Sequence, residues 1–107
     1  MKILITGGKS AQALKLLKSF ANDTVIFADY GEVPKMSAPQ YYFLSLGERN
    51  DDIIAHNLLN HCLNEGADAI LPMNSFEIEE LQKSRILFEE FNIKLMLSNG
   101  SQSLPLK

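Results

Sequence analysis

The sequence has a single cysteine, no tryptophan and no apolar run long enough to cross a membrane. With Cys62 alone, no disulfide can form within the chain, so a reducing compartment is the expected setting. A membrane-spanning helix needs about 20 predominantly apolar residues. The opening MKILITGG is too short, and too soon followed by glycines, to be a signal peptide. We therefore expect a cytoplasmic protein with no membrane partner.

An excess of positive charge is also missing. Ten basic residues stand against 13 acidic ones, which gives a net charge of −3 and no electrostatic footprint for nucleic acid. The hydrophobic content of 46% and the charged content of 21% are typical of a globular fold. A chain of 107 residues has the length of one domain.

Five short apolar runs alternate with three amphipathic patterns. The runs predict strands over 2–6, 24–29, 41–46, 68–73 and 93–97, and the patterns predict helices over 10–21, 51–64 and 75–91. Because the strands are continuously apolar, they are expected to be buried on both faces, as in a parallel sheet. Asn74 and Glu77 have the spacing of a capping box at the start of the last helix.

This element order predicts an α/β fold. We expect an open, mostly parallel five-stranded Rossmann-like sheet in the order 3-2-1-4-5, with helices on both faces. The long connection 30–40 is predicted to be irregular, and long loops of this kind are often functional. Residues 98–107 form a polar tail in this interpretation.

The stretch ITGGKSAQAL, residues 5–14, is similar to two nucleotide-binding motifs without completing either. A P-loop that ends in Gly8-Lys9-Ser10 would need its first glycine at position 3, which is Ile3 within the first strand. The connection is therefore too short to wrap around a phosphate.

A dinucleotide fingerprint fits the same stretch better. Gly7 permits the tight turn, Ala13 is small enough for close packing, and Asp29 ends the second strand where a ribose-binding acid belongs. Ser10, however, places a side chain where a pyrophosphate needs bare backbone. The chain also lacks a Tyr-x-x-x-Lys pair for hydride chemistry.

A simpler interpretation is that Gly7 and Gly8 turn the chain and Ser10 caps the helix. The N–H groups at such a helix start, with Lys9 beside them, would still favour a small anion. Across the sheet, Met73, Asn74, Ser75 and Glu77 follow the fourth strand. Strand order reverses between strands 1 and 4, where open α/β sheets bind ligands, so the two turns are expected to face each other.

Metal chemistry finds no support in the sequence. His56 and His61 lie about 140° apart on a helical wheel, so they cannot bind one ion together, and Cys62 is predicted to point into the core. Thr6-Gly7 ends the first strand where a receiver domain would need clustered carboxylates for magnesium.

Taken in order, the motifs resemble a known family. They present a glycine-containing turn, an Ala-Asp strand end, a serine-bearing loop and a proline-containing strand end followed by an acidic helix. The stretches are ILITGGKSAQALKLLKSF, VIFADY, PKMSAPQYYFLSL, GADAILPMNSFEIEELQK and IKLMLSN. Over residues 1–99 the chain resembles the N-terminal Rossmann-like, or pre-ATP-grasp, domain of ATP-grasp carboxylate–amine ligases, particularly the carbamoyl-phosphate-synthase-like members. Residues 100–107 would be a polar tail or the start of a linker.

The resemblance implies that ATP and the acceptor substrate are bound by different parts of the protein. In that family, ATP and magnesium are bound by two later subdomains, so no cofactor is expected in this chain. The N-terminal domain lends surfaces to the pocket for the acceptor substrate or acyl phosphate. The positions that would do so are Gly7, Gly8, Lys9 and Ser10, with Met73, Asn74, Ser75 and Glu77 opposite and Asp29 and Tyr30 on the flank.

The expected function is therefore that of a non-catalytic, substrate-side module of an ATP-dependent ligase, either excised from a longer protein or standing alone. Its partners would be the remaining grasp subdomains and a small carboxylate, amine or phosphate ligand. Two alternatives stay open at this point. One is a stand-alone module that binds NAD(P) or another nucleotide, and the other is a structural or interaction domain.

Overall fold

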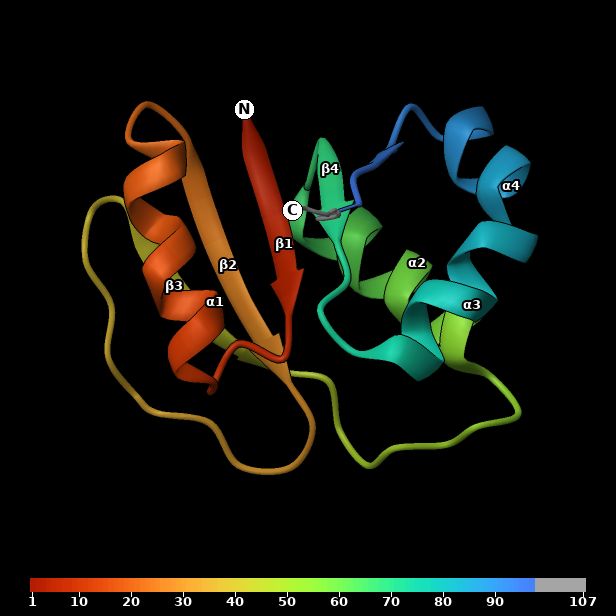
Figure 1. Cartoon of the computed structure of the whole chain (residues 1–107), viewed down its shortest axis with the longest axis horizontal. Coiled ribbons are helices and arrows are strands. Elements are labelled where there is room, and N and C mark those ends of the chain that lie inside the picture. Colours follow the sequence, from red (N-terminus) through yellow and green to blue (C-terminus); the bar gives the residue numbers. More distant parts are fainter. Residues whose placement is uncertain (98–107) are drawn as a thin grey trace, which may run out of the picture.

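Five parallel strands form one sheet in the order β3-β2-β1-β4-β5 in the computed structural model, which describes residues 1–97 (Figure 1). The strands are β1 (Lys2–Thr6), β2 (Thr24–Asp29), β3 (Tyr41–Ser45), β4 (Ala69–Leu71) and β5 (Lys94–Leu95). All four neighbouring pairs are parallel. The predicted α/β class, strand order and parallel pairing are confirmed.

The strands at the centre of the sheet are buried on both faces. β1 pairs with β2 on one side and with β4 on the other, so that Ile3 lies between Val25 and Ala69. All three of these side chains are fully buried. This explains why the strands have continuous apolar runs rather than an alternating pattern.

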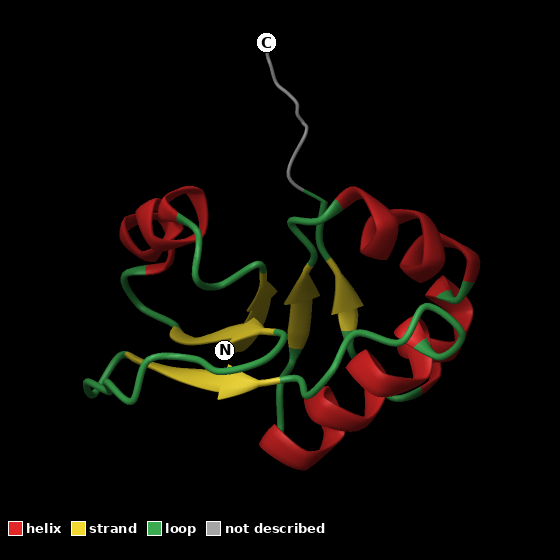
Figure 2. Cartoon of the chain, turned by 90° about the horizontal axis from the view of Figure 1, so that it is seen from below, coloured by secondary structure: helices red, strands yellow, loops and turns green. Residues whose placement is uncertain are grey.

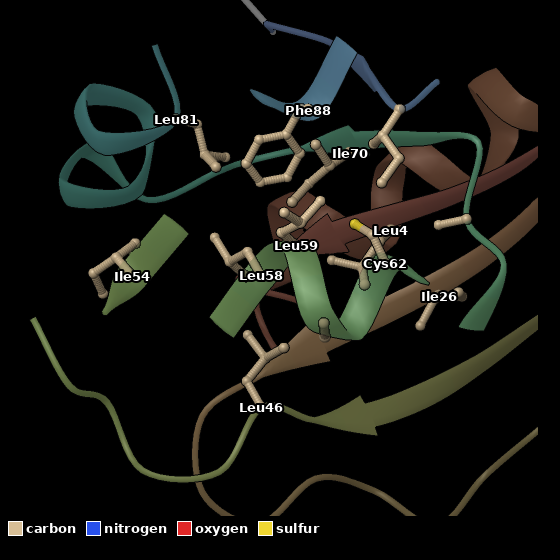
Figure 3. Packing of buried hydrophobic residues seen from close by; sticks show 13 residues of the cluster. Leu4, Ile26, Leu46, Ile54, Leu58, Leu59, Cys62, Ile70, Leu81 and Phe88 are labelled. Atoms are coloured by element: carbon tan, nitrogen blue, oxygen red, sulfur yellow. The ribbon is translucent and has the colours of Figure 1, made fainter. Parts of the chain in front are cut away.

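Helices cover the two faces unequally (Figure 2). One face carries the short helix α1 (Ala11–Lys15) and the 3-10 helix η1 (Leu16–Phe20). The opposite face carries α2 (Ile54–Glu65), α3 (Ser75–Lys83) and α4 (Arg85–Glu90). The larger core cluster lies under these three helices, where Leu58, Leu81 and Phe88 pack around Leu4 and Ile70 of the sheet (Figure 3).

The helices differ from the predicted ranges in three places. The helix predicted over 10–21 changes from α to 3-10 geometry after Lys15, and α2 begins at Ile54 rather than at residue 51. The helix predicted over 75–91 is interrupted at Ser84, whose N–H is shared between the carbonyls of Glu80 and Leu81. Leu81 before the interruption and Phe88 after it belong to the same core cluster.

Three strands are shorter than predicted, and the long connection has no helix. β3 ends at Ser45 rather than at residue 46. β4 ends at Leu71 because the following residue, Pro72, has no N–H to continue the ladder. β5 extends over only two residues. Residues 30–40 contain neither a helix nor a strand, and their one pairing is a bridge between Ser37 and Tyr42. The tail predicted over 98–107 lies outside the described residues.

Burial of Cys62 generates a prediction about its reactivity. The thiol is fully buried in the larger cluster, and this burial raises its pKa to about 12. Because the thiolate is the nucleophile, the native thiol should react slowly with an aromatic disulfide reagent at pH 8. The measurement is the rate of thiol release with and without denaturant. Fast, stoichiometric labelling of the native protein would show that the phase of α2 is wrong.

Candidate functional site

The turns after β1 and β4 are in direct contact at the carboxyl edge of the sheet. Gly7 has a φ of +64°, which favours glycine. A Cβ at Gly7 would lie 3.4 Å from both Asn74 Oδ1 and Met73 Cβ. The predicted juxtaposition of the two turns is therefore confirmed.

Gly8 is required by a close approach to β2 rather than by its backbone angle. A Cβ at this position would lie 2.6 Å from the carbonyl carbon of Phe27 and 2.8 Å from the nitrogen of Ala28. The Gly8 N–H donates to the carbonyl of Ala28 over 2.9 Å. The glycine pair that looked like part of a nucleotide motif thus serves the packing of the turn onto its neighbouring strand.

The backbone donors that were expected to receive an anion are already engaged. The N–H of Gly8 bonds to Ala28, that of Lys9 to Asp29 Oδ2 over 3.1 Å, and that of Ser10 to the Gly7 carbonyl over 3.0 Å. These three N–H groups thus have protein acceptors, and the anion contact at the helix start stays a prediction. The predicted cap is confirmed, because Ser10 Oγ accepts the N–H of Ala13 over 3.1 Å.

Lys9 and Asp29 both bond to the backbone of the long connection after β2. Lys9 Nζ donates to the carbonyls of Tyr30 and Glu32, each over 3.0 Å. Asp29 Oδ1 accepts the N–H of Tyr30 over 2.8 Å, while its other oxygen accepts the Lys9 N–H. Both carboxylate oxygens thus bond to backbone at the position where a dinucleotide fold would present them to a ribose.

Glu77 forms the centre of the contact between the two turns. Its side chain is fully buried, and its Oε1 accepts from Thr6 Oγ1 over 2.5 Å and from Asn74 Nδ2 over 2.9 Å. Its Oε2 accepts from the hydroxyl of Tyr30 over 2.7 Å. One carboxylate thus connects the end of β1, the residue after β2 and the residue before α3.

The capping box predicted for Asn74 and Glu77 is wrong in its bonding. Asn74 makes no side-chain cap bond to α3, because its amide is turned to the Glu77 carboxylate. Glu77 occupies the third position of α3, but its side chain points into the sheet edge rather than back along the helix. A capping box needs the acid to reach the N-cap N–H, and here the sheet offers two hydroxyl donors instead.

Thr6 and Tyr30 complete the hydrogen bonding of the carboxylate. Thr6 Oγ1 also accepts the N–H of Met73 over 2.9 Å, which ties the turn after β4 directly to β1. Burial, followed by the hydrogen bond to Glu77, raises the pKa of Tyr30 far above its ordinary value, so its hydroxyl stays protonated and donates. No sequence motif connects Thr6 with Glu77. The position of Thr6 at the end of a buried strand was the available signal.

A loop beyond β3 packs onto the same edge. The Tyr30 ring lies 6.0 Å from that of Phe76, and the guanidinium of Arg49 lies 3.6 Å above the Phe76 ring. Arg49 also pairs with Asp51 over 2.6 Å, which raises the pKa of Arg49 and lowers that of Asp51. Sequence reasoning missed Arg49 and Phe76 because no motif relates them.

The remaining predicted site residues, Met73, Ser10 and Ser75, lie around the contact between the two turns, and we call this margin the rim. Met73 is half-buried and packs on the smaller core cluster, whereas Ser10 and Ser75 are exposed. Shallow hollows border this edge, one of them lined by Asp51, Ile54, Phe76, Glu79 and Glu80. The space between Gly7 and Glu77, by contrast, holds the Asn74 side chain.

Within residues 1–97, no group of three or more histidine, cysteine, aspartate or glutamate side chains could hold a metal ion. His56 is exposed and His61 half-buried, while Cys62 points into the core. Over the same residues, no helix combines the length and the apolar character that crossing a bilayer requires.

Comparison with known proteins assigns no family to this chain. No protein-family model matches the sequence, and no curated protein matches it with significant similarity.

The contact at Gly8 predicts a stability difference between two glycines. Gly8→Ala should lower the free energy of unfolding by about 3 kcal/mol, because the new methyl group meets backbone that cannot move aside. Gly31→Ala is the control. Gly31 has a φ of +72° but open space around it, so the cost should be only about 1 kcal/mol of backbone strain. Both are measured by denaturant unfolding, and equal losses would contradict the close approach at Gly8.

Proposed function

We propose that this chain is a non-catalytic, substrate-side module of an ATP-dependent carboxylate–amine ligase of the ATP-grasp type. The observation that supports the proposal is the contact between the turns after β1 and β4 at the carboxyl edge, where open α/β sheets place their ligands. The motif order that resembles the pre-ATP-grasp domain coincides with this geometry.

The proposal assigns ATP and magnesium to other subdomains. Over residues 1–97, the N–H groups at the glycine turn bond to protein acceptors and no acid cluster could hold a metal ion. Both groups would therefore be bound by grasp subdomains, joined to this chain or supplied by a second one. The exposed rim of the edge, with Ser10 and Ser75, would border a small carboxylate, amine or phosphate substrate once those subdomains close over it.

A second candidate is a structural or interaction domain. The observation that favours it is the Glu77 carboxylate, which together with Asn74 and Tyr30 occupies the contact between the turns after β1 and β4. A domain with such a contact can support a neighbouring active site without touching its substrate. The two candidates differ in whether the rim matters for turnover.

Nucleotide affinity provides the first test. The chain alone should hydrolyse no ATP and bind Mg-ATP no more tightly than about 1 mM, which corresponds to roughly 4 kcal/mol. The expected reason is the engagement of its N–H donors by protein acceptors. Isothermal titration calorimetry with Mg-ATP measures this directly. A micromolar dissociation constant for Mg-ATP would refute the assignment of ATP to other subdomains.

Variants of the rim separate the two candidates. The chain, purified together with the grasp subdomains it binds, should release ADP only when both a carboxylate and an amine substrate are present. Ser75→Lys should lower this rate at least about tenfold, equal to 1.4 kcal/mol, because it adds a long charged side chain at the exposed rim. Asn22→Lys is the matched control, since Asn22 is exposed but precedes β2 at the opposite edge. Equal rates for the two variants would favour the structural role.

A further inference from the structure

Glu77 is the one charged side chain of residues 1–97 that is fully buried. No basic group forms an ion pair with it in this part of the chain, and Lys9 is directed to backbone carbonyls instead. A buried carboxylate without a cation is costly unless hydrogen bonds satisfy its oxygens. Here the donors are Thr6, Tyr30 and Asn74, at 2.5, 2.7 and 2.9 Å.

The three donors come from the places that border a bound ligand in other open α/β sheets. Thr6 ends β1, Tyr30 follows β2, and Asn74 stands between β4 and α3. Strand order reverses between β1 and β4, so the carboxylate lies at the topological switch point. The start of α3 adds a favourable dipole for negative charge.

We propose that Thr6, Tyr30 and Asn74 form a carboxylate-binding site whose ligand is built into the chain as Glu77. The side chain fastens the ends of β1, β2 and β4 to one another, as a bound ligand would. The site recognises a carboxylate, because all three side chains donate hydrogen bonds to it and none of them carries a charge. If the Glu77 carboxylate is removed and its surroundings persist, a small free carboxylate should take its place.

Removal of the side chain tests this proposal by chemical rescue. Glu77→Ala deletes Cγ and the carboxyl group, which together have the size and shape of acetate. The melting temperature should fall by roughly 10–20 °C, because three hydrogen bonds to a charged group are lost. Sodium acetate should then raise it by at least about 3 °C more than sodium chloride at the same ionic strength. Butyrate, which is too long for the space, should give no such rise.

Glu77→Gln is the matched control. It keeps the volume of the side chain but offers one acceptor oxygen in place of two, so it should be destabilised without opening a space. Neither this variant nor the wild-type protein should respond to acetate beyond the effect of chloride. A Glu77→Ala variant that acetate stabilises no more than chloride does, or that melts at the wild-type temperature, would overturn the proposal.

A second measurement covers the case in which Glu77→Ala does not fold. Tyr30→Phe removes only the hydroxyl that donates to Oε2. It should lower the melting temperature by about 5 °C in the wild-type background, and by clearly less in the Glu77→Gln background. An equal loss in both backgrounds would show that the Tyr30 hydroxyl does not act through the Glu77 carboxylate, and would overturn the proposal.

Discussion

The carboxyl edge of this sheet depends on the burial of one carboxylate, because a buried negative charge requires that every donor around it be held in place. Thr6, Tyr30 and Asn74 can satisfy Glu77 only if β1, β2 and the start of α3 keep their relative positions. The same requirement fixes Met73, whose N–H bonds to the Thr6 hydroxyl. Loss of one donor would leave a charge buried and incompletely compensated, so the network favours one arrangement over looser alternatives.

A second set of contacts around Glu77 holds the connections after β2 and β3 in place. Lys9 fastens the connection after β2 through two carbonyls, and Asp29 returns two bonds to the backbone of the same region. On the other side, Arg49 stacks on Phe76 and brings the loop after β3 to the start of α3. Four connections at the carboxyl edge are thereby joined. An edge of this kind is compatible with the proposed role of a module that offers a fixed surface to neighbouring subdomains.

The glycine turn resembles a nucleotide-binding motif but uses its residues for contacts within the protein. Its letters are similar to phosphate-binding patterns, yet Gly8 is needed for contact with the backbone of β2 and the N–H groups bond to protein acceptors. A nucleotide-binding turn requires glycines that expose backbone to the ligand. In this chain the same residue type brings two parts of the protein together, and only the surrounding contacts distinguish the two uses.

The sequence by itself determined the sheet and the location of its candidate functional edge. Continuous apolar runs and their alternation with helical patterns were sufficient for the strand order, and this order alone placed the turns of Gly7 and Asn74 side by side. These features are carried by local periodicity and by general rules of chain connection. The burial of Cys62 followed from the same periodicity.

Only the tertiary structure decided how that edge is used. The spacing of Asn74 and Glu77 indicated a helix cap, but Thr6 and Tyr30, which lie 71 and 47 residues away in the chain, turn the Glu77 carboxylate into the sheet. The bonds from Lys9 to the carbonyls of Tyr30 and Glu32 likewise depend on partners that are distant in sequence. Local patterns specify which groups are available, whereas the direction of a hydrogen bond depends on which donors the fold brings within about 3 Å.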